Sequence, residues 1–215
     1  AAVQAVMPDV ILWRRDFHQN PELGFAEHRT AEVIAEHLRG LGLEVRVGVG
    51  KTGVVAILRG GRPGRTVALR ADMDALPVEE ATGLPFASTA TGTYQGRTVP
   101  VAHACGHDAH VAMLVGAARL LADRRGDLAG RVRFMFQPGE EGSGGARVMI
   151  DEGVLDGVDR AFALHITPNI PIGRAACRPG PILASAEPGG YRVPLEVLGK
   201  PRPISTIWAS SWAAW

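Results

Sequence analysis

The sequence predicts an α/β fold, in which helices pack against a sheet. Short apolar runs bounded by glycine and proline alternate with segments of helical periodicity, and this order of elements is typical of α/β sheets. The composition is that of an ordinary globular domain, with 46% hydrophobic and 21% charged residues. A chain of 215 residues with this composition can bury a sizeable core and form one large domain, or one domain with part of another.

Helical periodicity predicts the first two elements. Residues 1–19 place apolar side chains at helical spacing, and Asn20-Pro21 ends that run. A second apolar stripe runs from about Arg29 to Leu41, and Gly42 is suited to cap the end of this helix. Two helices are therefore expected before the first strand.

Strands and two further helices are expected in the next part of the chain. The strands are predicted from alternation or from short apolar runs, at residues 43–47, 54–58, 66–69, 131–136 and 161–164. Helices are predicted at about 111–124 and 146–152. Residues 78–100 lack periodicity and are expected to form a long loop, and loops of this length are often functional.

Charge and cysteine content argue against several classes of protein. The formal net charge of +1 gives no reason to expect nucleic acid or an anionic membrane as a partner. There is no apolar run of membrane-spanning length and no charged-then-apolar leader, so neither a membrane span nor a signal peptide is expected. Two cysteines do not make a disulfide framework, which favours a reducing compartment, and Cys177 is expected to be a plain buried thiol.

The strongest chemical signal lies between His103 and His110. These eight residues hold three of the seven histidines, one of the two cysteines and one aspartate. Cys105 and His107, two residues apart, can point at one metal ion, and thiolate and imidazole are ligands that Zn²⁺ prefers. The start of the following helix would also favour the thiolate. The alternative is a half-buried thiol among incidental histidines.

Acidic residues and a histidine follow three of the predicted strands. They are Asp72 and Asp74, Glu140 and Glu141, and His165. The carboxyl ends of strands in an α/β sheet meet at one rim, so these groups are expected to lie near Cys105 and His107. One carboxylate of a Glu-Glu pair can bind a metal while the other accepts a proton from metal-bound water. The alternative for each acidic pair is a turn with solvated carboxylates.

Four motifs in this order resemble the dinuclear-metal amidohydrolases and exopeptidases of the aminoacylase and carboxypeptidase type. The resemblance runs from about Trp13 to about Gly199 and is greatest to hippurate hydrolases, indole-3-acetyl-amino-acid hydrolases and N-acetyl-diaminopimelate deacetylases. The motifs are Arg70-Ala71-Asp72-Met73-Asp74-Ala75-Leu76-Pro77, His103-Ala104-Cys105-Gly106-His107-Asp108, Gln137-Pro138-Gly139-Glu140-Glu141 and Leu164-His165.

The resemblance implies an activity and a role for each site residue. The activity is metal-dependent hydrolysis of the amide bond of N-acyl amino acids or small peptides, with two divalent ions drawn from Zn²⁺, Mn²⁺, Co²⁺ and Ni²⁺. The implied metal ligands are Cys105, His107, Glu141 and His165. Glu140 would be the general base that activates a metal-bound water, with Asp72 and Asp74 behind the ligands. Relatives are mostly cytoplasmic and often homodimers, so a cytoplasmic location is expected.

The resemblance also implies an architecture that this chain completes only in part. The expected fold is a three-layer αβα catalytic domain with a mostly parallel, mixed sheet, represented by residues 1–186, and residues 187–199 would begin a lid and dimerisation domain with a strand at 191–198. Residues 200–215 are expected to be an aberrant tail, because three of the four tryptophans fall in the last eight residues and no acidic residue follows Glu196. A shifted reading frame is one explanation and a genuinely divergent tail is the other.

Two alternatives to an active enzyme follow from this organisation. In the family the lid mediates dimers, and the catalytic domain supplies a last histidine ligand after the lid. Both are expected to be missing here, so the chain could be a non-catalytic fragment with weak or no metal binding. The other alternative is a thiol enzyme with Cys105 as nucleophile and His107 as base, which leaves Glu140, Glu141 and His165 without a role.

Overall fold

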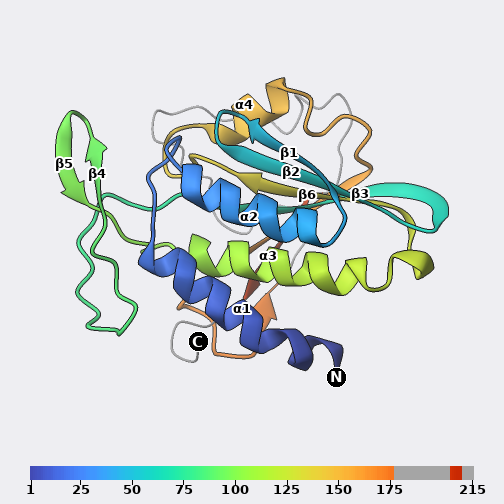
Figure 1. The fold of residues 1–215 in the computed structure, drawn as a ribbon, viewed down its shortest axis with the longest axis horizontal. Helices are drawn as coiled ribbons and strands as arrows, with labels where there is room; N and C mark the ends of the chain where they lie inside the picture. The colour runs from blue at the N-terminus through green and yellow to red at the C-terminus, as the bar shows by residue number, and fades with distance from the viewer. Residues whose placement is uncertain (177–203, 210–215) are drawn as a thin grey trace.

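A computed structural model describes residues 1–176 and the backbone of residues 204–209, and its central feature is one mixed seven-stranded sheet (Figure 1). The strand order across this sheet is β1-β2-β6-β3-β7-β9-β8. The strands are β1 (Glu44–Val49), β2 (Gly53–Arg59), β3 (Arg62–Asp72), β6 (Ala129–Gln137), β7 (Arg160–Ile166), β8 (Ala175–Ala176) and β9 (Ile204–Ala209).

Parallel pairing occupies the centre of the sheet. β3 pairs in parallel with β6 on one side and with β7 on the other, and β9 continues the parallel set beyond β7. The flanking pairs β1–β2, β2–β6 and β9–β8 are antiparallel. In the register of β3 and β6, Asp72 lies opposite Gln137, so the two strands end side by side. The predicted α/β class with a mixed sheet is confirmed.

Helices cover both faces of the sheet, which gives three layers. They are α1 (Ala2–Gln19), α2 (His28–Gly40), α3 (His107–Ala122) and α4 (Gly145–Asp151). In Figure 1, α2 and α3 lie on one side of the strands and α4 lies on the other. α1 packs on the outside of α3, where Val6 and Val10 contact Ala112. α2 ends where the sequence predicts, since Gly42 adopts a φ of 70° just beyond the helix.

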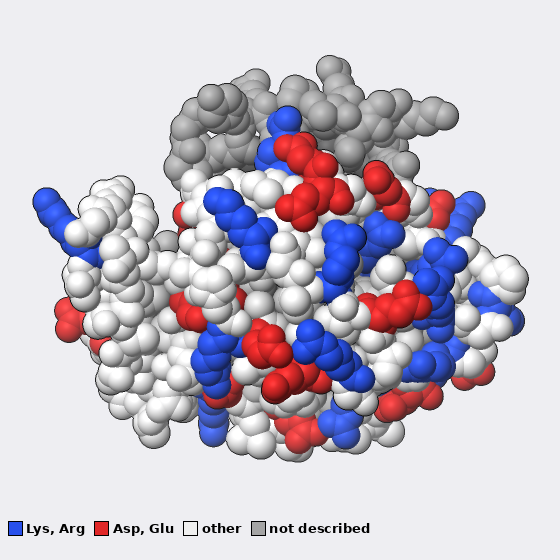
Figure 2. Space-filling model, turned by 45° about the horizontal axis from the view of Figure 1, so that its top comes forward, with Lys and Arg blue, Asp and Glu red and all other residues white. Residues whose placement is uncertain are grey.

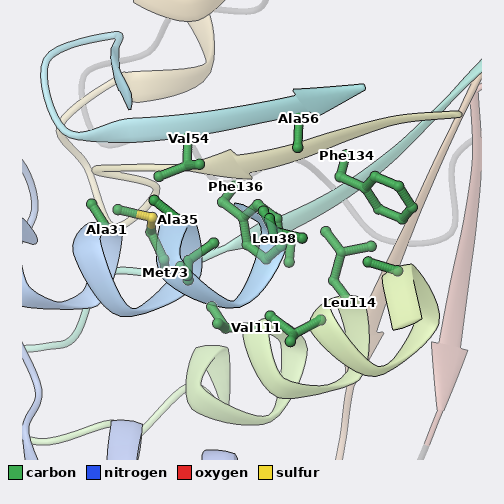
Figure 3. Packing of buried hydrophobic residues seen from close by; sticks show 14 of the residues in the cluster. Ala31, Ala35, Leu38, Val54, Ala56, Met73, Val111, Leu114, Phe134 and Phe136 are labelled. Atoms are coloured by element: carbon green, nitrogen blue, oxygen red, sulfur yellow. The ribbon is translucent and has the colours of Figure 1, made fainter. Parts of the chain in front are cut away.

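The main core lies between the sheet and the helices α2 and α3 (Figure 3). Alternate residues of β2 and β6 point toward these helices, among them Phe136, which lies beside Leu38, and Phe134, which lies above Leu114 in the view. The intervening residues face the opposite layer, where Met135 packs with Met149 of α4. Because both faces of β2 are buried, its residues 54–58 form an apolar run rather than a strict alternation.

The structure differs from the sequence expectation at residues 78–100. This segment includes a two-stranded hairpin of β4 (Thr91–Tyr94) and β5 (Arg97–Pro100), which projects from the body of the fold (Figure 1). Gln95 and Gly96 have φ of 50° and 74°, the two positive values that a type I′ hairpin turn requires. The expectation of a loop was wrong here, because each strand has only four residues and is mostly exposed, which leaves little apolar pattern.

Two expectations fall on or beyond the edge of the described residues. The predicted lid strand at 191–198 and the buried thiol of Cys177 both lie outside them. β9 lies within residues 200–215, the segment expected to depart from the family. Among the described residues, no helix is both long and apolar enough to cross a lipid bilayer.

Surface charge on the described part of the molecule is mixed. Figure 2 shows lysine and arginine side chains interspersed with aspartate and glutamate over the face in view. The near balance of charged residues agrees with this picture, since 23 basic and 22 acidic residues give a formal net charge of +1.

Candidate metal centre

The residues singled out from the sequence meet at one end of the parallel strands. Asp72 is the last residue of β3 and His165 lies in β7, one residue before its end. Glu140 and Glu141 occupy the turn that follows β6, and His107 is the first residue of α3. The rule that strand ends converge therefore predicted the neighbourhood correctly. His107 belongs to the helix itself rather than to the loop before it.

His107 stands at the middle of this group. Its Nε2 atom lies 3.6 Å from Oδ2 of Asp72, 3.8 Å from Oε2 of Glu140 and 3.8 Å from Oε1 of Glu141. On the other side, Sγ of Cys105 lies 3.4 Å from Nε2 of His165. Donor atoms of Cys105, His107 and His165 lie within 4.8 Å of one another, and so do those of His107, Glu140 and Glu141. These two donor groups, and a third formed by Asp72, His107 and His110, all share the imidazole of His107.

Hydrogen bonds to main-chain carbonyls orient both imidazoles. Nδ1 of His107 lies 2.8 Å from the carbonyl oxygen of Asp74, so the Nδ1–H donates there and Nε2 faces the carboxylates. Nδ1 of His165 lies 2.5 Å from the carbonyl oxygen of Ile166, and its Nε2 faces Cys105. Metal-ligating histidines usually donate their second ring N–H in this way, which fixes the ring and its tautomer.

Asp74 lies directly behind the candidate ligands. Its Oδ2 accepts the main-chain N–H of Glu141 at 2.9 Å, while its carbonyl oxygen accepts from His107. One residue just beyond β3 therefore holds both the first turn of α3 and the Glu140–Glu141 turn. The resemblance implies a supporting role for Asp74, and this role stays a prediction.

Asp72 belongs to a second layer of hydrogen bonds. It accepts from Nη1 of Arg70 at 2.6 Å and from Nδ1 of His110 at 2.5 Å. The main-chain N–H of Ile166 donates to Nε2 of His110, which makes Nδ1 the protonated nitrogen of His110. Burial would raise the pKa of Asp72, but the charges of Arg70, His107 and His110 hold it well below its usual range.

The electrostatic field of the group favours a cation. Burial lowers the pKa of His107, but the charge of Asp72 and the proximity of Asp74 and Cys105 raise it to about 11. Burial raises the pKa of Glu140, and the nearby Asp72 charge adds to this shift. A positive charge next to Nε2 of His107 is therefore stabilised by several carboxylates, and a divalent ion meets the same field with a larger charge.

The donor atoms fit a metal ion by their chemistry and by their lack of other partners. Nε2 of His107, Oε1 of Glu141 and Oδ1 of Asp74 are buried without a hydrogen-bond partner among the described residues. Buried polar atoms are normally paired, so these orphaned atoms indicate a further partner. Sulfur, nitrogen and carboxylate donors together suit Zn²⁺ and similar transition metals.

Opposing influences act on the pKa of the Cys105 thiol. Burial raises this pKa, whereas the proximity of His107 lowers it. A metal ion would bind the thiolate form, because coordinated thiols lose their proton.

Sequence reasoning gave no role to two residues that support the site, His110 and Glu27. His110 lies three residues after His107 on α3, so helical spacing could have placed it on the same face. Glu27 hydrogen-bonds to Gly139 across 112 positions of sequence, and no local pattern signals this contact.

Comparison with known proteins agrees with this geometry. The sequence profile of peptidase family M20/M25/M40 matches residues 68–212. Thermostable carboxypeptidase 2 of Saccharolobus solfataricus is 50% identical over 181 residues, which cover 83% of this chain and 44% of the relative. N-acetylcysteine deacetylase of Bacillus subtilis is 45% identical over 179 residues, covering 83% of this chain and 45% of the relative.

A solved structure shares the fold at similar sequence identity. The YXEP protein of Bacillus subtilis, described as a dinuclear metal-binding peptidase of the M20 family, matches with a TM-score of 0.76 and 43% identity, over 83% of this chain and 48% of that structure. The chain thus spans about half the length of the relatives it matches. Since the family profile matches well over half of the 215 residues, this chain belongs to peptidase family M20/M25/M40.

Proposed function

We propose that this chain carries part of the catalytic site of a metal-dependent amidohydrolase that acts on N-acyl amino acids or small peptides. The observation that carries the proposal is the orphaned Nε2 of His107, which faces two carboxylates on one side and shares its surroundings with Cys105 and His165 on the other. The names of the relatives support the reaction class, because a carboxypeptidase and an N-acetylcysteine deacetylase both hydrolyse an amide bond.

Four side chains would hold two divalent ions in this proposal. They are Cys105, His107, Glu141 and His165. Zn²⁺, Mn²⁺, Co²⁺ and Ni²⁺ are the candidate metals, and when bound they polarise a carbonyl and lower the pKa of water. Asp74 and Asp72 would keep the ligands in place through the contacts described above.

Glu140 is the proposed general base. Its side chain is 40% exposed, whereas that of Glu141 is 24% exposed, so Glu140 is the carboxylate better placed to reach a substrate. Burial and Asp72 raise its pKa toward the range in which a carboxylate can take and return a proton. Glu140 would accept a proton from the attacking water and deliver it to the leaving amine.

The test is metal content and hydrolysis of N-acetyl and N-benzoyl amino acids by the 215-residue chain, with Glu140→Gln as the matched variant. We expect Glu140→Gln to keep the bound metal and to lower turnover by about 10²- to 10⁴-fold, which is the rate enhancement that a general base usually contributes. Equal turnover in the two proteins would show that Glu140 is not the base.

The partial coverage of the relatives favours a second possibility for these 215 residues tested alone. They span 44% to 48% of the matched relatives, so the chain could be a non-catalytic part of such an enzyme that holds metal weakly or not at all. Absence of turnover together with weak metal binding would support this alternative. The homodimer and the cytoplasmic location that the resemblance implies stay predictions.

A further inference from the structure

The carboxylate of Glu27 is completely buried near the candidate site and uses both of its oxygens. Oε1 accepts the main-chain N–H of Gly139 at 2.8 Å. Oε2 accepts the hydroxyl hydrogen of Thr52, which lies in the turn between β1 and β2. Glu27 is 0% exposed, and burying a carboxylate costs free energy unless its oxygens are satisfied. The two bonds explain how this residue is tolerated but not what it does.

Gly139 is the residue immediately before Glu140, so its position sets the start of the turn that carries Glu140 and Glu141. Its backbone has a φ of 55°, and its carbonyl oxygen accepts the N–H of Gly145 at 3.1 Å. A Cβ at Gly139 would come within 3.2 Å of the Phe25 ring and 2.9 Å of the Cβ of Ser143. The turn is therefore closely packed, and its N–H is held by Glu27.

The segment before Glu27 also touches the end of β3. The main-chain N–H of Ala75 donates to the carbonyl oxygen of Glu22 at 2.8 Å, and Leu23 bridges to Ala75 in parallel. A Cβ at Gly24 would lie 3.3 Å from Oδ2 of Asp74 and 3.0 Å from the Cα of Gly139. The same short segment thus contacts both structures that present the candidate ligands.

Glu27 is not needed to cap the helix that it precedes. Its side chain makes no capping hydrogen bond to α2. That task falls to Glu22, whose carboxylate accepts the N–H groups of Arg29 at 3.0 Å and Thr30 at 2.8 Å. The carboxylate of Glu27 is directed at Gly139 instead, across 112 positions of sequence.

We infer that Glu27 is a positioning residue, which holds the Gly139–Glu141 turn where its two carboxylates meet His107. This inference rests on the proposed function, because the turn matters for chemistry only if Glu140 and Glu141 serve a metal site. Thr52 assists by fixing the second oxygen of Glu27. Glu27 contacts no substrate and acts only through the turn.

The experiment compares Glu27→Ala, Glu27→Gln and Thr52→Val with a matched control, Thr30→Val. Thr30 is a buried threonine of α2 whose hydroxyl has no hydrogen-bond partner among the described residues. Two properties are measured on the 215-residue chain. One is Co²⁺ binding, followed by its visible absorption spectrum, and the other is hydrogen–deuterium exchange of the peptide that spans residues 137–145.

Removing the acceptor of the Gly139 N–H, in Glu27→Ala, and keeping an acceptor there, in Glu27→Gln, should give opposite results. Glu27→Ala should weaken Co²⁺ binding by about 10- to 100-fold, as removal of outer-shell partners does, and should change the Co²⁺ spectrum. Glu27→Gln should restore both, because the amide oxygen can accept from Gly139 and the amide N–H can donate to Thr52. Thr52→Val should weaken binding by about 2- to 10-fold, the factor of one hydrogen bond, and Thr30→Val should not.

The outcomes separate this inference from the proposed function. If the folded Glu27→Ala and Thr52→Val chains bind Co²⁺ as Thr30→Val does, with the same spectrum, Glu27 is only structural and the inference is wrong. If Glu27→Ala does not fold, Thr52→Val alone decides in the same way. If the unaltered chain binds no Co²⁺, the proposed function fails, yet faster exchange at residues 137–145 in Glu27→Ala would still show that Glu27 holds the turn.

Discussion

Nδ1 of His107 lies 2.8 Å from the main-chain carbonyl oxygen of Asp74, so a residue two positions beyond β3 orients an imidazole at the start of α3. The carboxylate of the same aspartate accepts the N–H of Glu141 at 2.9 Å. Asp74 therefore fixes two candidate donors, His107 and Glu141, that come from two other parts of the sequence. This arrangement makes Asp74 the clearest target for a test of the metal site.

Asp74→Ala should lower the affinity for Zn²⁺ or Co²⁺ by about 10- to 100-fold, because mutation of residues that hydrogen-bond to metal ligands typically lowers metal affinity by that factor. Asp74→Asn should lose less, since its amide oxygen can still accept from Glu141. Isothermal titration calorimetry with Co²⁺ measures both. Asp151→Ala, at a carboxylate that is 61% exposed on α4, is the control. An Asp74→Ala chain that binds Co²⁺ like the control would exclude the role given to Asp74.

Replacement of Cys105 distinguishes a metal ligand from a nucleophile. Cys105→Ser should lower Zn²⁺ affinity, because a serine hydroxyl is a much poorer zinc ligand than a thiolate. Any amide hydrolysis shown by the unaltered chain should persist at saturating metal and disappear with a chelator. The thiol-enzyme alternative makes the opposite forecast, namely that turnover is lost in Cys105→Ser whatever the metal concentration.

The core between the sheet and the helices α2 and α3 should dominate the stability of the described domain. Leu38 is 0% exposed within this core, whereas Leu12 is 61% exposed on α1. Leu38→Ala should lower the free energy of unfolding by about 2–5 kcal/mol, because it leaves a cavity. Leu12→Ala should change it by less than about 0.5 kcal/mol. Urea denaturation followed by circular dichroism compares the two, and similar losses would contradict the assigned core.

His18 should make stability depend on pH. Its Nδ1 lies 2.8 Å from Asp108 and its Nε2 lies 3.0 Å from Glu80. Burial and the nearby Arg14 lower the pKa of His18, but the hydrogen bonds to Asp108 and Glu80 and the charge of Asp108 outweigh them and raise it. Folding therefore favours the protonated form. The resulting stabilisation is full below the unfolded pKa of about 6.5 and is lost as the pH rises through the folded pKa.

The corresponding measurement is the difference in unfolding free energy between the unaltered chain and His18→Gln, from about pH 5.5 to about pH 8.5. This difference should be greatest at the acidic end and should shrink as the pH rises. His28→Gln, at an exposed histidine of α2, controls for the exchange itself. A difference that stays constant or grows with pH would mean that His18 does not gain a proton on folding.

Much of the fold could be predicted because local patterns reflect burial directly. Residues 54–58 are an apolar run because both faces of β2 are covered, whereas residues 131–136 begin with arginine alternating with apolar residues. Both patterns predict their strand within a residue or two. β3 is longer than predicted, from Arg62 to Asp72, because its first residues are exposed and pair with β6 through the backbone. Backbone pairing of that kind leaves no mark in the hydrophobic pattern.

The sequence could predict which candidate donors lie close together, because the reason is topological. It could not predict the contacts that hold those donors in place. Asp72 and Glu140 follow strands that turn out to be parallel neighbours, so the meeting of strand ends brings them together. The contact from Glu27 to Gly139 depends on how a loop between two helices packs on a distant turn. Only the tertiary structure reveals such a contact, because neither residue belongs to a periodic pattern.

The arrangement of the central strands has a kinetic consequence. β3, β6 and β7 are adjacent and parallel but come from residues 62–72, 129–137 and 160–166, so their pairing closes long stretches of chain. Such non-local pairing forms slowly, because loop-closure entropy is lost before the contacts repay it. Two of the candidate donors, Glu141 and His165, lie at the ends of β6 and β7, and Cys105 and His107 lie at the start of α3. These four residues are scattered until the pairing is complete. Metal uptake during refolding would therefore be a late event, and its rate would report when the centre of the sheet has closed.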